Sequence, residues 1–177
     1  MNVDTLQAAA DQGDASAQCA LGNMYATGRG VAKDEARAVQ LCQAAADQGY
    51  AHAQCFLGVM YATGRGVAKN EARAVELFQA AADQGDAGAQ CALGVMYATG
   101  RGAAKNEARA VELFQAAAEQ GHATALFNLG NMYRDGRGVA KDEARAMQLY
   151  QATRARGSPS ATCTRTGTAS QRTRRPR

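Results

Sequence analysis

Long apolar runs are absent from this 177-residue chain, which limits where the protein can act. No apolar run approaches about 18 residues, the length at which a membrane-spanning helix becomes a candidate. The opening residues, MNVDTLQAAADQG, have neither the basic start nor the apolar core of a secretory signal. The sequence therefore predicts a cytoplasmic protein, or an exported one if an upstream segment carrying a signal has been lost.

Residue patterns that carry catalysis are also missing. The chain has no H-E-x-x-H, G-x-S-x-G, S-x-x-K or G-x-x-x-x-G-K-[ST] motif, and no C-x-x-C pair for zinc. A lone histidine near a helix start, such as His52 or His122, is typical of a surface or capping residue. The sequence therefore predicts no enzyme, no catalytic, cofactor-binding or metal-binding residue, and no cofactor.

What the chain has in abundance is repetition. LGVMYATGRG occurs at 57–66 and at 93–102, and close copies occur at 21–30 and 129–138, each offset by 36 residues. A fixed period in this range predicts a solenoid. The units are 14–49, 50–85, 86–121 and 122–156, preceded by a partial unit at 1–13 that corresponds to half of a second helix.

Each unit is predicted to form two helices, since apolar residues recur three and four positions apart. In the first unit, the first helix (helix A) covers about Ala15–Thr27 and the second (helix B) about Glu35–Gln48. Glycine after helix A, in Gly-Arg-Gly, ends that helix. The predicted N-caps of helix B are Asp34, Asn70, Asn106 and Asp142; those of helix A are Asp14 and Asp86, with poorer caps at Tyr50 and His122.

These units resemble the Sel-1-like repeat family. The resemblance rests on AQxxLGxMYxxGxGV (17–31, 53–67), the following K-[DN]-xxxRA, and AAxQG (45–49, 81–85, 117–121), and it covers residues 15–156. A period of 36 with a glycine loop distinguishes them from 34-residue tetratricopeptide repeats. The resemblance implies an all-α, right-handed superhelical solenoid that acts as an adaptor or scaffold for protein complexes.

Helix A varies between units at positions spaced by three and four, which places them on one helical face. We expect this face to line a concave groove that binds a protein or peptide. The alternative is that solvent-facing positions drift without function. An exposed Phe56 would favour the groove, whereas a Phe56 buried in the core would contradict it. The predicted groove residues are Ser16, Ala20, Asn23, His52, Phe56, Val59, Gly88, Ala92, Val95, Thr124, Asn128 and Asn131.

The loops between the helices carry repeated basic residues that form rows along one edge. The rows are predicted to be a solvated edge balanced by the nearby glutamates, with a weak anion-binding edge as the alternative. The residues are Arg29, Arg65, Arg101, Arg137, Lys33, Lys69, Lys105 and Lys141, with Glu35, Glu71, Glu107 and Glu143.

The cysteines are predicted to be reduced, buried and structural. Cys19, Cys55 and Cys91 share one repeat position, and equivalent positions in stacked helices lie about 8–10 Å apart, too far for a disulfide. Cys42 is matched by Phe78, Phe114 and Tyr150, which indicates a core position.

Residues 157–177 contain five arginines and no acid, whereas residues 1–156 hold 15 Lys/Arg and 16 Asp/Glu, a net charge of 15 − 16 = −1. This tail lacks apolar periodicity and is predicted to be disordered. Three interpretations stay open: a functionless end, such as a truncated or frameshifted fifth unit; an electrostatic tether for nucleic acid or an anionic surface; or a localisation signal. Binding through the tail would be weak and salt-sensitive.

The predicted function is therefore protein–protein interaction through the groove, with tail-mediated binding of nucleic acid or an anionic surface as the rival. The two ends of the array lack polar capping units, so we also expect self-association.

Overall fold

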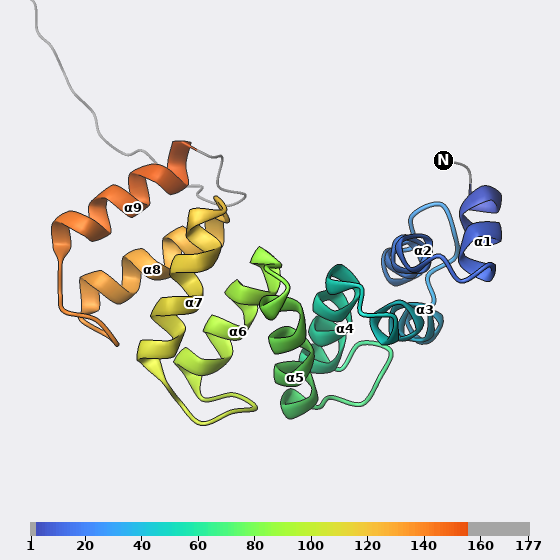
Figure 1. Cartoon of the computed structure of the whole chain (residues 1–177), viewed down its shortest axis with the longest axis horizontal. Helices are drawn as coiled ribbons and strands as arrows, with labels where there is room; N and C mark the ends of the chain where they lie inside the picture. The colour runs from blue at the N-terminus through green and yellow to red at the C-terminus, as the bar shows by residue number, and fades with distance from the viewer. Residues whose placement is uncertain (1–2, 156–177) are drawn as a thin grey trace, which may run out of the picture.

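The computed structural model describes residues 3–155, and the predicted tail at 157–177 lies outside them. Within the described range the chain forms nine α-helices and no strand. Figure 1 shows them following one another along an arc, with α1 and α9 at opposite ends. The helices are α1 (Val3–Asp11), α2 (Ala15–Thr27), α3 (Glu35–Asp47), α4 (Ala51–Thr63), α5 (Glu71–Asp83), α6 (Ala87–Thr99), α7 (Glu107–Glu119), α8 (Ala123–Asp135) and α9 (Glu143–Ala155).

Two kinds of helix alternate along the array, as the sequence predicted. Helices A are α2, α4, α6 and α8, and helices B are α3, α5, α7 and α9, with α1 as a shorter helix B at the start. Each helix A packs against the helix B that follows it and against the helix B that precedes it. The array is therefore one continuous all-α solenoid. The predicted end of the first helix B was one residue too late, because Gln48 is its C-cap.

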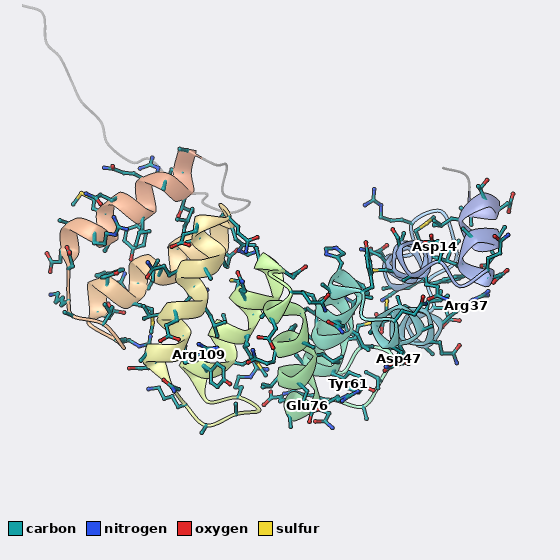
Figure 2. The ribbon with its side chains drawn as sticks, in the orientation of Figure 1. Asp14, Arg37, Asp47, Tyr61, Glu76 and Arg109 are labelled. Atoms are coloured by element: carbon teal, nitrogen blue, oxygen red, sulfur yellow. The ribbon has the colours of Figure 1, made fainter. Side chains whose placement is uncertain are left out.

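Side-chain caps begin most of these helices, and they confirm the predicted capping residues. Asp14 accepts a hydrogen bond from the Ala17 backbone N–H at 2.7 Å, and Figure 2 shows it where the chain enters α2. The four predicted caps of helix B accept from the backbone N–H three residues later. Tyr50 makes no such bond, and His122 accepts through Nδ1 at a longer 3.3 Å. The prediction of poorer caps at these two positions is confirmed.

The core is built mostly from positions that stay constant between units, together with one varied position held by Cys42, Phe78 and Phe114. The helix A residues Ala53, Leu57, Ala89 and Leu93 are fully buried, as are their counterparts on helix B such as Ala81. The glycine after each of these leucines makes room for one side chain of the following helix B. A Cβ on Gly94 would lie 2.7 Å from the Phe114 ring; Gly58, Gly130 and Gly22 face Phe78, Tyr150 and Cys42 in the same way. The repeated Leu-Gly pair therefore sets how closely the two helices approach.

The Gly-Arg-Gly loops join neighbouring units, a role the sequence analysis did not foresee. The first glycine of each loop ends helix A in the left-handed conformation, as predicted. The second glycine packs on the preceding unit: a Cβ on Gly66 would overlap the backbone carbonyl of Glu35. Between the two glycines, Arg65 donates to Glu35 at 3.2 Å and to the Ala26 carbonyl at 3.0 Å. The loop is therefore a clamp between units as well as a helix stop.

Buried glutamines form a second link between the helices. Gln54 on α4 donates to the Ala46 carbonyl of the preceding helix B at 3.4 Å. The side-chain carbonyl of Gln54 accepts a hydrogen bond from the side-chain amide of Gln84, the C-cap of α5, at 2.8 Å. Gln18 and Gln90 accept from Gln48 and Gln120 in the same way. These pairs explain why A-Q at the start of helix A and A-A-x-Q-G at the end of helix B recur together.

None of the helices between residues 3 and 155 is long and apolar enough to cross a membrane.

Candidate functional site

The variable positions of helix A keep solvent-accessible surface, and three of them, Phe56, Ala92 and Val95, also pack against the edge of the core. All twelve predicted groove residues have solvent-accessible surface, whereas the constant residues beside them are buried. Six are exposed: Ser16, Ala20, Asn23, His52, Val59 and Thr124. Six are half-buried: Phe56, Gly88, Ala92, Val95, Asn128 and Asn131.

Among the described residues, this face includes the following two concavities. One, of about 170 Å³, lies between α6 and α8, and the predicted residues Val95, Asn128 and Asn131 line it. Its lining also includes Phe114 of α7 and Arg137 of the following loop, which the sequence analysis did not assign to the groove. The signal for Phe114 was present in the sequence, since the large residue at this repeat position packs on the glycine of the Leu-Gly pair in helix A.

The second concavity, of about 550 Å³, lies at the other end of the array. Ala20, Asn23, Met24 and Thr27 of α2 line it, together with Arg29 and Gly30 of the loop. Its lining residues all come from one unit. Of the predicted residues, the structure thus brings together Val95, Asn128 and Asn131 in one hollow, and Ala20 and Asn23 in another.

Several polar residues of the face hold neighbouring elements in place. Asn131 accepts a hydrogen bond from the Tyr150 hydroxyl at 2.7 Å, and Asn128 hydrogen-bonds the Cys91 thiol. His52 lies 3.4 Å from a carboxylate oxygen of Asp86, the N-cap of α6. These side chains are oriented by protein contacts, and the exposed residues Ser16, Asn23 and Thr124 present further polar atoms to solvent.

Phe56 is not the exposed aromatic residue that would favour the groove. It is half-buried and packs against two parts of the core, one around Leu57 and Leu77 and the other around Ala38 and Met60. Phe56 therefore does not support the groove as an exposed aromatic would, because its ring packs between the first two units. Val59, one turn further along α4, is the large apolar residue that this helix exposes.

The basic rows are neutralised by glutamates, as the first of the two interpretations predicted. Glu35 accepts from Lys33 at 2.9 Å and from Arg65 at 3.2 Å, and these two bonds hold the pKa of its carboxyl below the ordinary value. Glu71 and Glu107 have the same arrangement. Because three of the four loop arginines already pair with a carboxylate, this edge offers little free positive charge for an anion.

The described cysteines are free thiols, which confirms the prediction that they do not bridge. Cys19, Cys42 and Cys91 are buried as predicted, whereas Cys55 is half-buried. Burial raises the pKa of Cys42 and of Cys55 to about 12 and that of Cys91 to about 11, and it also raises the pKa of Cys19. A thiol with a raised pKa is protonated at neutral pH and reacts slowly with electrophiles.

We therefore expect a Cys163→Ser variant, which keeps only these four cysteines, to resist iodoacetamide at pH 8 while folded. All four should be alkylated in urea, with half-buried Cys55 the first to react as urea rises. Mass spectrometry of the labelled protein counts the modified thiols. Rapid labelling without urea would contradict the buried positions.

Comparison with known proteins gives one family. The Sel1 repeat profile matches residues 15–50, 51–86, 87–122 and 123–158. Among solved structures, the protective antigen c5321 of uropathogenic Escherichia coli, which has an SLR fold, is 37% identical with a TM-score of 0.84. A Sel1 repeat protein from Oxalobacter formigenes is 38% identical with a TM-score of 0.76. No curated protein matches the chain.

The matches cover most of this chain and part of each relative. They span 89% of the chain and 34% of the E. coli protein, and 81% of the chain and 57% of the Oxalobacter protein. The immunity protein Pa5087 of Pseudomonas aeruginosa, at 23% identity and a TM-score of 0.51 over 87% of this chain and 73% of that one, shares the fold alone. Four consecutive matches, with the stacked helix pairs and glycine loops described above, show that the chain belongs to the Sel1 repeat family.

Proposed function

We propose that this chain is an interaction scaffold that binds a protein or peptide segment along the variable face of helices A. Sel1 repeat proteins are generally protein-interaction scaffolds and typically not enzymes. The observation that carries the proposal is the separation of variable from constant positions. On helix A, the twelve varied positions keep solvent-accessible surface, whereas constant residues such as Ala53 and Leu57 are buried.

The second and third units sharpen this argument because they are nearly identical. They differ at five pairs of positions: 50/86, 52/88, 56/92, 67/103 and 83/119. Two of these pairs, 52/88 and 56/92, belong to the variable face, while the core positions are unchanged. A series of binding subsites requires surface residues that differ from unit to unit on a core that stays the same.

The chemistry of the face favours a partner segment of low charge. The twelve positions hold no carboxylate, lysine or arginine. They combine small side chains such as Ala92 and Gly88, the apolar Val59 and Val95, and amide groups. Such a surface can bury apolar side chains of a peptide and hydrogen-bond its backbone without a large desolvation penalty.

Binding is tested with peptides selected on the immobilised chain from a phage-displayed library. A selected peptide should lose at least about tenfold in affinity for the triple variant Asn23→Arg, Val59→Arg and Thr124→Arg, because bulky charges then occupy exposed positions on three helices A. The variant Ala72→Arg and Ala80→Arg is a matched control, since both alanines are exposed on helix B. It should bind the peptide as the unmodified chain does.

The same experiment distinguishes binding by the variable face from binding by the basic residues 157–177. A chain ending at Arg156 should keep peptide binding if the variable face is the site. Ligands lost on this truncation, and weakened by salt, would instead assign binding to residues 157–177. Equal binding by the triple variant and the unmodified chain would contradict the proposal.

A further inference from the structure

The last helix of the array presents an open face. Each of α3, α5 and α7 packs on the helix A that follows it, but α9 has no following helix within residues 3–155 (Figure 1). Met147 on α9 is 61% exposed, whereas Val111 at the same position of α7 is 8% exposed. Phe127 on α8 is half exposed, whereas Cys91 at the same position of α6 is buried. Apolar surface that neighbouring units cover elsewhere is thus open at this end.

Charge is also unbalanced on this face. Glu35, Glu71 and Glu107 each accept an arginine from the next unit. Glu143 is the equivalent residue of α9. Its carboxylate pairs with Lys141 at 2.8 Å, and no arginine among the described residues pairs with it. Its side chain is 72% exposed, compared with 26% for Glu107.

At the other end of the same face, arginine replaces alanine. Ala46 and Ala82 are buried against the next helix A, and the equivalent residue of α9 is Arg154. Arg154 is exposed and makes no hydrogen bond or ion pair with any residue between 3 and 155. Residues 156–177 contain no Asp or Glu that could pair with it. A following unit stacked in register would meet this long side chain where only alanine allows close packing, so the face does not suit a further unit.

The spacing of these residues makes the face complementary to itself. Glu143, Met147 and Arg154 are separated by four and seven positions, which places them in one stripe along α9. Glutamate lies at one end, arginine at the other, and methionine between them. When two such helices meet antiparallel about a two-fold axis, each glutamate faces an arginine of the other copy.

We propose that the outer face of α9 is a homodimer interface. Two copies pack their α9 helices antiparallel, so that Glu143 pairs with Arg154 of the partner subunit and the two Met147 side chains bury each other near the centre. The Phe127 ring, whose centroid lies 5.7 Å from that of the Tyr150 ring, adds exposed apolar surface at this end of the array. The dimer leaves the variable face of helices A free for the proposed partner, so each dimer presents two binding faces.

Charge reversal tests this arrangement, because each substitution acts twice in a symmetric dimer. Sedimentation equilibrium of the full chain should show a concentration-dependent monomer–dimer equilibrium. Glu143→Lys and Arg154→Glu should each weaken dimerisation by at least about tenfold. An equimolar mixture of the two single variants should dimerise again, since the introduced lysine of one copy then faces the introduced glutamate of the other, and the remaining native pair is intact. The double variant Glu143→Lys, Arg154→Glu should also recover.

Recovery in the mixture shows that the single variants are folded and that the pairing is between copies. Arg29→Glu serves as a control for head-to-tail stacking, because Arg29 is the loop arginine at the opposite end of the array and lacks a glutamate partner among the described residues. It should dimerise as the unmodified chain does. A strictly monomeric full chain, single variants that dimerise normally, or loss of the dimer in Arg29→Glu would each overturn the proposal.

Discussion

Replacing Gly66 by alanine is expected to destabilise the array by at least about 3 kcal/mol, a large effect for the addition of one methyl group. Gly66 has a φ of +68°, which for alanine costs about 1–2 kcal/mol. The new Cβ would also overlap the backbone carbonyl of Glu35, and a backbone group of a packed helix cannot move aside as a flexible side chain can. The substitution therefore pushes the second unit away from the first and breaks the Arg65 clamp.

Urea unfolding followed by far-UV circular dichroism measures this change. Gly85→Ala is the matched control, because Gly85 has a similar φ of +86° and a Cβ added there would meet no atom within 4 Å. Its free energy of unfolding should fall only by the cost of placing alanine at a positive φ, about 1–2 kcal/mol. Since neighbouring units stabilise each other, Gly66→Ala should also broaden the transition as the first unit unfolds separately. Equal losses in the two variants would contradict the clamp role of the loop.

Replacing Phe114 by alanine is expected to cost about 3–5 kcal/mol. The ring is 2% exposed and packs among Leu129, Met132 and the backbone at Gly94. Its removal leaves a cavity between α6, α7 and α8 that helices fixed at both ends cannot close. The ring also lines the concavity beside Asn128 and Asn131, so the same change should weaken peptides that bind there.

A double-mutant cycle with Gly94 isolates the contact. Gly94→Ala alone should be destabilising, because its Cβ would lie 2.7 Å from the ring. In the Phe114→Ala background the same change should be nearly neutral, giving a coupling energy above about 1 kcal/mol. Cys42→Ala is the smaller-effect control at the equivalent position of the first unit, with an expected loss of about 1 kcal/mol. Independent effects of the two substitutions would mean that the ring does not set the approach of α6 and α7.

Much of this fold follows from local sequence signals repeated at a fixed period. The helix pairs were predictable because the apolar spacing, the Asp or Asn caps and the stopping glycines all act within one turn of the residues that carry them. The bounds of α2 match the predicted Ala15–Thr27. The separation of core from variable positions was also predictable, since a helix has one face for each set.

The packing partners of individual side chains required the three-dimensional structure. The sequence left the exposure of Phe56 open, and the structure half-buries it against the core. The second glycine of each loop looks like a helix stop in the sequence, and it proves to be a contact between units. The nearby glutamates predicted a balanced basic edge, but only the structure shows that three loop arginines pair with glutamates of the preceding unit.

The sequence by itself determined the period, the helix pairs, the caps, the core positions and the family. Tertiary structure decided which exposed positions share a hollow, which charges are already neutralised, and which end of the array stays open. The physical reason is distance along the chain. Caps and helical stripes depend on residues three or four positions apart, whereas the clamps and hollows join residues about one repeat apart, and only the stacking of the units fixes their geometry.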